Sequence, residues 1–230
     1  MGRKNLKLFV KGGADIVDAA LSRADGGTKL DSGVRELVAS EFSDVEVETM
    51  HEGCPGFAEL RLELESGDST LIAEAPQIVL LSIADDVRNL NRSGFNLEDD
   101  VHRVEADLVA SIDLIKEKVG AHVLIANVST LDPSEKVFNY HDVDDDPVSL
   151  RAHRLDLMLV GVSHNEGISI IDVDRKIAEL GGSIGVAAAF DYSERGCEII
   201  VEEIVRVMDD YGFFDDRQLL AQVGARAGGK

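Results

Sequence analysis

Four polar turns in this sequence each follow a short apolar run, and they hold most of the side chains that could do chemistry. The turns are Lys11-Gly12-Gly13-Ala14-Asp15, Ala84-Asp85-Asp86, Asn127-Val128-Ser129-Thr130 and Asp172-Val173-Asp174. In an open parallel sheet, ligands bind beyond the carboxyl ends of the strands. We therefore expect the four turns to border one crevice, in which carboxylates are candidate general bases or cation ligands.

None of these turns carries a complete catalytic or cofactor motif. The Gly12-Gly13-Ala14 turn lacks the spacing of a dinucleotide-binding or phosphate-binding loop, which favours a tight turn between a strand and a helix. Asp85 and Asp86 resemble a metal or general-base pair, although adjacent acids after a strand more often begin a helix, whose dipole they stabilise. We expect no cofactor and no metal; an acid-lined metal site formed by Asp15, Asp85 and Asp191 is the weaker alternative.

The histidines divide by their predicted surroundings. His51 and His141 lie in predicted loops, where an imidazole can act as a general base. The other four lie in predicted helices or at the start of a predicted strand, which favours a packing or surface role. No HxxxH or HxH spacing of a metal site occurs.

The composition is strongly acidic. The formal net charge is -21 over 230 residues, with 44 Asp and Glu against 23 Lys and Arg. Such a charge repels nucleic-acid backbones and anionic lipid head groups, so we expect neither nucleic acid nor a membrane as a partner. The two cysteines lack disulfide or zinc spacing, and no apolar stretch approaches the roughly 18 residues of a membrane span, which favours a soluble cytoplasmic protein. The oligomeric state does not follow from the sequence.

Five short apolar runs alternate with helical patterns along the chain. The runs span residues 6–10, 45–50, 78–83, 122–127 and 168–172. Runs of this length that are apolar on both faces are typical of parallel strands covered by helices on both sides. The alternation predicts one three-layer α/β/α domain over residues 1–214, with a central parallel sheet of about five strands, and a mobile tail over residues 215–230.

Helix start and stop signals place the intervening helices. Apolar residues at three- and four-residue steps predict a long helix over residues 97–119 that Gly120 ends. Further helices are predicted from Pro147 to Gly167, over residues 174–180 and over residues 193–211, the last with Asp191 and Glu194 as a capping box. Residues 57–65 fit a strand or a helix, and the acidic segment 132–146 is predicted to be a surface loop.

The order of these blocks resembles the SGNH/GDSL hydrolase family over residues 6–214. The family's Gly-Asp-Ser block is similar to Gly12-Gly13-Ala14, its Gly-x-Asn-Asp block to Ala84-Asp85-Asp86, and its Asp-x-x-His block to residues 188–191. Its oxyanion-hole glycine block is similar to residues 52–56. The resemblance implies a flavodoxin-like α/β/α fold and a ligand-binding crevice formed by Gly12, Gly13, Ala14, Asp15, Gly53, Gly56, Asp85, Asn127 and Asp191.

The departures from the family fall on its catalytic residues. The positions of its serine, aspartate and histidine hold Ala14, Ala188 and Asp191, and Asp85 replaces its oxyanion-hole asparagine. Serine catalysis needs a hydroxyl, a base within hydrogen-bond reach and an orienting acid. The resemblance therefore implies a pseudoenzyme with a degenerate triad, which binds a small ligand or a partner in the former active-site crevice.

An active enzyme with a relocated mechanism is the alternative. In that case Asp85, Asp191, His51 or His141 activates water, and backbone N–H groups of the glycine turns hold the developing oxyanion. The family resemblance then implies hydrolysis or transfer of an ester or acyl group, with O-acetyl sugars among the substrates.

Overall fold

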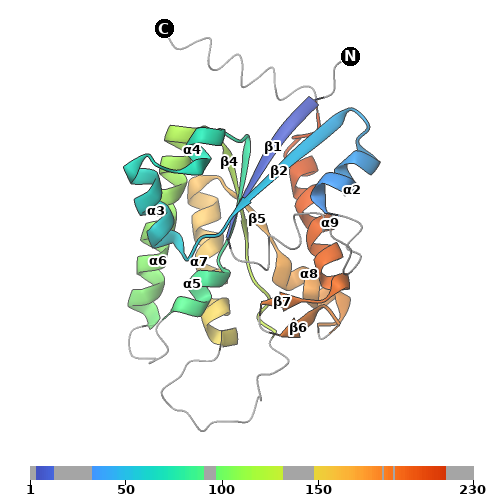
Figure 1. Ribbon diagram of the computed structural model, residues 1–230. Helices are drawn as coiled ribbons and strands as arrows, with labels where there is room; N and C mark the ends of the chain where they lie inside the picture. The colour runs from blue at the N-terminus through green and yellow to red at the C-terminus, as the bar shows by residue number, and fades with distance from the viewer. Residues whose placement is uncertain are drawn as a thin grey trace.

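The computed structural model of the protein describes residues 4–12, 33–90, 97–131, 148–182, 184–188 and 190–215. Within these residues, a five-stranded parallel sheet has helices on both faces (Figure 1). The strand order is β2-β1-β3-β4-β5, so the chain passes from the edge strand β2 across β1 to the central strand β3. The predicted three-layer α/β architecture is confirmed.

The five predicted strands are all present, with ends that differ by a few residues. They are β1 (Lys4–Lys11), β2 (Val45–Glu52), β3 (Ile78–Ser82), β4 (His122–Ala126) and β5 (Ser169–Ile171). Every residue of the central strand β3 is buried. The prediction of a run apolar on both faces is wrong for β2, because this edge strand alternates buried Val45 and Val47 with exposed Glu46 and Glu48.

Three helices pack on one face of the sheet: α2 (Val34–Glu41), α8 (Val173–Leu180) and α9 (Glu194–Asp210) (Figure 1). The sheet contributes Leu6, Leu8 and Val10 of β1 to the apolar cluster on this side. Phe9 points to the other face, because successive side chains of a strand alternate between the two faces. One strand thus supplies both halves of the core.

The opposite face is covered by α3 (Phe57–Ser66), α4 (Thr70–Glu74), α5 (Ala84–Asn89), α6 (Leu97–Leu114) and α7 (Val148–Glu166). A π-helical turn, η1 (Ile115–Val119), extends α6 up to Gly120, which has the left-handed φ of 73° that favours glycine. A two-stranded antiparallel ribbon, β6 (Val186–Ala188) with β7 (Asp191–Tyr192), precedes α9.

Packing decides between strand and helix for residues 57–65, which the sequence left open. Residues 57–65 belong to helix α3, in which Phe57, Leu60 and Leu64 are buried on one side while Leu62 is 57% exposed. The predicted capping box of α9 is wrong: the N-cap is Ser193, whose Oγ accepts the N–H of Gly196, because Asp191 lies in β7. The segment 132–146 and nearly all of the predicted tail lie outside the described residues.

No helix among the described residues is both long enough and apolar enough to span a lipid bilayer.

Candidate functional site

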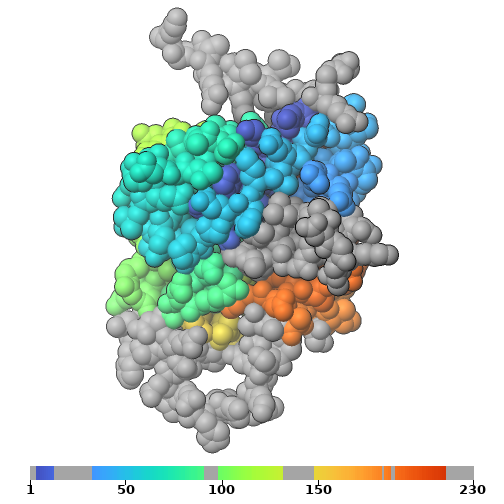
Figure 2. All heavy atoms as spheres, viewed as in Figure 1, coloured from blue at the N-terminus to red at the C-terminus, as the bar shows by residue number. Residues whose placement is uncertain are grey.

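The carboxyl ends of the strands lie at one edge of the sheet, where α5 and the β6–β7 ribbon also lie (Figure 1). In the space-filling view, the visible atoms of α5 (green) and of the C-terminal part of the chain (orange) lie below those of α3 and β2 (Figure 2). Lys11 at the end of β1 pairs with Glu52 of β2 and Leu81 of β3, so the first three strand ends are neighbours. Gly12 follows β1, and a Cβ there would lie 3.0 Å from Cβ of Ser82. The close approach of these two strand ends favours glycine at position 12.

A buried carboxylate, Asp86, joins α5 to the turn after β2. Asp86 is 8% exposed, and its Oδ1 accepts the backbone N–H of Phe57 at 3.1 Å. Its Oδ2 is buried without a hydrogen-bond partner among the described residues. Burial, with smaller contributions from the nearby carboxylates of Asp85 and Glu59, raises the pKa of Asp86 to about 7. The sequence indicated the helix start but not this burial.

The predicted base Asp85 is paired within its own helix. Its Oδ1 accepts a hydrogen bond from Nη1 of Arg88 at 2.7 Å, and the Arg88 guanidinium lies 4.7 Å from the ring centroid of Phe190. Phe190 has a left-handed φ of 58° in the turn between β6 and β7. Asp85 is therefore part of a contact between α5 and this turn.

The other predicted catalytic residues are dispersed over the described structure. His51 is exposed on the edge strand β2, and Asp191 is exposed on β7. No hydrogen bond between described residues joins either of them to Asp85. Gly53 is exposed and Gly56 is buried at the start of α3. Further predicted residues lie outside the described part of the chain: Gly13, Ala14, Asp15 and His141.

An ion-pair cluster that the sequence did not reveal joins the end of β1 to β2 and α3. The buried Nζ of Lys11 lies 2.8 Å from Oε2 of Glu52 and 2.7 Å from Oε2 of Glu63, while Ser69 donates to Glu63 at 2.5 Å. Burial lowers the pKa of Lys11, but the hydrogen bonds to the two glutamates outweigh it and leave the pKa above its ordinary value. This lysine balances its neighbours and is not available to an incoming anion.

The half-buried thiol of Cys54 is a poor nucleophile. It donates to the carbonyl of Gly56 at 3.1 Å, and burial raises its pKa to about 11. Because the thiolate is the reactive form of cysteine, Cys54 is protonated and unreactive near neutral pH.

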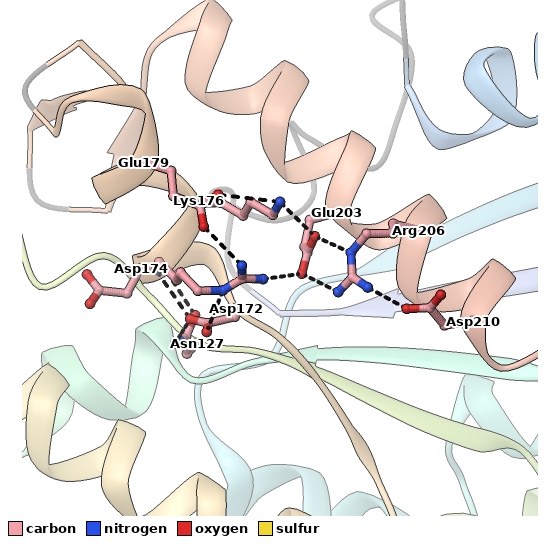
Figure 3. Close-up of polar contacts among 9 residues, drawn as sticks. Asn127, Asp172, Asp174, Lys176, Glu179, Glu203, Arg206 and Asp210 are labelled. Carbon is pink, nitrogen blue, oxygen red and sulfur yellow. Dashed lines mark hydrogen bonds and ion pairs between the residues drawn. The ribbon is translucent and has the colours of Figure 1, made fainter.

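A cavity of about 420 Å³ lies beside the ends of β4 and β5. Among the described residues predicted to form the crevice, only Asn127 lines this cavity. Its Nδ2 donates to Oδ1 of Asp172 at 3.1 Å. Its Oδ1 accepts the N–H of Asp174 at 3.2 Å (Figure 3). Asn127 therefore fixes the start of α8 against the end of β4, and Asp172 caps that helix by accepting the N–H of Arg175.

Charged side chains of α8 and α9 close one side of this cavity (Figure 3). Glu203, 2% exposed, accepts two hydrogen bonds of 2.7 Å from Arg206 and one of 3.3 Å from Arg175. Lys176 adds an ion pair at 3.4 Å. Each of these cations is paired with Glu203 and remains partly exposed, so together they add little net positive charge to the cavity.

Asp156 of α7 lines the same cavity with a buried Oδ1 that has no hydrogen-bond partner among the described residues. Burial, followed by the carboxylates of Asp174 and Asp172, raises the pKa of Asp156 to about 8. Apolar side chains complete the lining: Leu157, Leu159, Val160 and Ile170.

Comparison with known proteins shows a similarity of overall fold to solved structures. Neither a family profile nor a curated protein matches the sequence. The acetylxylan esterase Axe2 of Geobacillus stearothermophilus superimposes with a TM-score of 0.63 at 16% identity, over 89% of this chain and 94% of that one. A lipolytic G-D-S-L family protein from Veillonella parvula gives a TM-score of 0.59 at 16% identity, over 88% and 98%. The chain has the SGNH/GDSL hydrolase fold.

Within this SGNH fold, the hydroxyl of Ser169 contacts the imidazole of His122. This contact lies at the amino ends of the strands, opposite the candidate site. Nε2 of His122 lies 2.9 Å from Oγ of Ser169, and these residues begin β4 and β5. Ser169 is 4% exposed, and the His122 ring packs 4.9 Å from that of Tyr211 and 5.3 Å from that of Phe213. The pair is a packing contact remote from the strand ends.

In the described part of the SGNH fold, no three His, Cys, Asp or Glu side chains are arranged to hold a metal ion. The alternative metal site would need Asp15, which lies outside that part, together with Asp85 and Asp191. Arg88 already pairs with Asp85.

Proposed function

We propose that this SGNH-fold protein binds a small ligand in the former active-site crevice and does not hydrolyse esters. The observation that carries the proposal is the state of the candidate bases: Asp85 is paired with Arg88, and Asp191 is exposed without a bond to any described nucleophile. A general base must lie within hydrogen-bond reach of the proton that it removes. Ala14 at the family's serine position supports the same conclusion.

The charge at the strand ends favours a neutral or positively charged ligand. The carboxylates of Asp172 and Asp174 line the cavity beside β4 and β5, while Asp156 in the same cavity is mostly protonated near pH 7 and adds no charge. The two arginines of this cavity, Arg175 and Arg206, are paired with Glu203. The net charge of -21 adds a repulsive field for anions. A volume of about 420 Å³ falls within the range of roughly 300–1,000 Å³ that is common for small-molecule sites.

An acyl-ester hydrolase with a relocated mechanism is the second candidate. The similarity of fold to Axe2, named an acetylxylan esterase, favours acetylated sugars as substrates under this alternative. The pKa of about 7 at Asp86 would also suit a general base near neutral pH. This candidate predicts that Asp191→Asn and His141→Ala lower turnover while the protein stays folded.

Hydrolysis of short p-nitrophenyl esters and acetylated sugars separates the two candidates. The natural protein is compared with a variant that restores the family triad, Ala14→Ser/Ala188→Asp/Asp191→His, and with Asp191→His alone as the control without a nucleophile. We expect turnover only in the triple variant. Turnover by the natural protein that Asp191→Asn or Asp85→Asn reduces would establish the relocated mechanism instead.

A further inference from the structure

The turn over residues 53–56, at the rim of the crevice, is fastened to α5 by two side chains. Oδ1 of Asp86 accepts the N–H of Phe57 at 3.1 Å, directly after the turn. Nδ2 of Asn89 donates to the carbonyl of Pro55 at 2.7 Å. Asp86 and Asn89 both belong to the six-residue helix α5 (Figure 1). Their two hydrogen bonds therefore hold the turn against this helix.

The turn excludes water from the Asp86 carboxylate. A Cβ at Gly56 would lie 3.0 Å from Oδ1 of Asp86 and 3.5 Å from Oε2 of Glu59, and Gly56 has a φ of 153°. Oδ2 of Asp86 is buried and makes no hydrogen bond within the described structure. The Asp86 carboxylate is therefore buried beneath the turn. Its hydration requires the turn to move away.

Among the described residues, the charged groups around Asp86 do not compensate a negative charge on it. Glu59 of α3 and Asp85 of α5 both repel it, and the Cys54 thiol of the turn is uncharged near neutral pH. Two cations of the described chain at this end of the sheet are paired with other acids: Arg88 with Asp85, and Lys11 of β1 with the glutamates of β2 and α3. The N–H of Phe57 favours the ionised form, but burial outweighs it.

We propose that Asp86 is a proton-dependent latch that holds the 53–56 turn on α5 when it is protonated and releases the turn when it is ionised. Opening the turn exposes Oδ2 of Asp86 to water. The latch concerns the turn itself, so it stands or falls independently of the proposed ligand.

The direction of the pH effect follows from linkage. The closed turn holds the pKa of Asp86 at about 7, whereas a hydrated aspartate titrates near about 4. Between these values the closed form binds more protons than the open form. Raising the pH therefore favours opening, by up to about tenfold per pH unit between pH 5 and pH 7, with a plateau above pH 7.

Alkylation of Cys54 by iodoacetamide measures this opening, because the thiol lies in the turn and is half-buried when the turn is closed. Cys197, 6% exposed in the core, serves as the internal reference. The Cys54 rate is measured from pH 5 to pH 8.5 in the natural protein and in Asp86→Asn. Their ratio cancels the thiol's own titration, since both open states expose the same group.

We expect the ratio of natural to Asp86→Asn rates to rise at least tenfold between pH 5 and pH 7 and then to level off. Asp113→Asn, on the exposed side of α6, should behave as the natural protein. Asn89→Ala, which removes the second fastening, should raise the rate at every pH and keep the pH dependence; this variant tests the latch even if Asp86→Asn folds poorly. A ratio that stays flat, or loss of the pH dependence in Asn89→Ala, would overturn the proposal.

Discussion

The buried ionisable side chains discussed above differ in whether a charged partner compensates them. Lys11 is buried with two carboxylates in contact, whereas Asp86 and Asp156 each keep one buried oxygen without a hydrogen bond among the described residues. A compensated buried charge adds rigidity, and an uncompensated one shifts its pKa until it is neutral. The two kinds predict opposite effects of substitution.

Removal of the compensated charge should destabilise the protein. In Lys11→Met, Glu52 and Glu63 are left facing each other without their cation, and we expect a loss of about 1–3 kcal/mol in the free energy of unfolding. Lys116→Met breaks an exposed pair with Glu166 and should cost less than about 1 kcal/mol. Urea denaturation measures both; equal losses would contradict the role given to burial.

Removal of the uncompensated charge at Asp156 should stabilise the protein at high pH. The native carboxyl keeps its proton up to about pH 8, whereas in the unfolded chain it titrates near about 4. The native state therefore binds more protons in this window, and its stability falls as the pH rises. We expect Asp156→Asn to match the natural protein near pH 4 and to exceed it by on the order of 1–3 kcal/mol at pH 8.5. Denaturation curves that differ equally at both pH values would refute this.

For single residues, the sequence predicts the place in the sheet better than it predicts the hydrogen-bond or ion-pair partner. The strand-end rule correctly located Gly12, Asp85 and Asn127 at one edge of the sheet. It could not distinguish Asp85 from Asp86, since the first faces an arginine of its own helix and the second faces α3, from a distant part of the chain. Such differences arise only from tertiary packing.

At the scale of elements, α8 and α9 are joined by a charge network rather than by apolar contacts alone (Figure 3). Burial raises the pKa of Glu203, but its bonds to Arg206 and Lys176 outweigh this and leave the pKa below its ordinary value. Its stabilising contribution is therefore present above about pH 4.5 and is lost as the pH falls through the native pKa.

The variant Glu203→Gln should lower the free energy of unfolding by about 2–4 kcal/mol at pH 7, because three cations lose their buried anion. The deficit should shrink as the pH falls below about 4.5, because the glutamate takes up a proton in the unfolded chain before it does so in the native state. Glu202→Gln, at a side chain 58% exposed, is the matched control and should change stability by less than about 1 kcal/mol. A deficit that persists unchanged at pH 3.5 would argue against an electrostatic origin.

Two glycines in helices should respond oppositely to alanine. A Cβ at Gly196 would lie 2.2 Å from the carbonyl oxygen of Gly185, so Gly196→Ala must push α9 from the turn before β6 and cost about 1–3 kcal/mol. Gly161 of α7 has open space around it, and Gly161→Ala should gain about 0.5–1 kcal/mol from helix propensity. Thermal unfolding of both variants checks the pair, and a shift in the same direction would contradict this packing.

The elements themselves followed largely from the sequence. Five apolar runs became the five strands, because a buried parallel sheet requires such runs. The helix over residues 57–66 could not be decided, since its leucines fit both periods and only contact with α6 buries one set of them. The ribbon of β6 and β7 was missed because its segments, Val186–Ala188 and Asp191–Tyr192, lack the run of branched apolar residues that marks the five strands of the sheet.

At the scale of the whole molecule, the SGNH fold persists at 14–16% identity to the solved structures named above and to a GDSL-like lipase of Parabacteroides merdae, which gives a TM-score of 0.61. The order of apolar strands and amphipathic helices sets the architecture, and many sequences satisfy it. Catalysis depends instead on a few side chains at the strand ends, so these can change while the fold remains.

Binding at the strand ends is the central claim, and amide chemical shifts test it most directly. Isotope-labelled protein is titrated with matched small molecules that differ only in charge: a neutral amide, the corresponding amine and the corresponding carboxylate. We predict that the neutral or cationic compounds shift amides near Gly53, Asn127 and Asp172 with saturation, and that the carboxylate does not. Saturable shifts confined to other surfaces, or a preference for the carboxylate, would contradict the account.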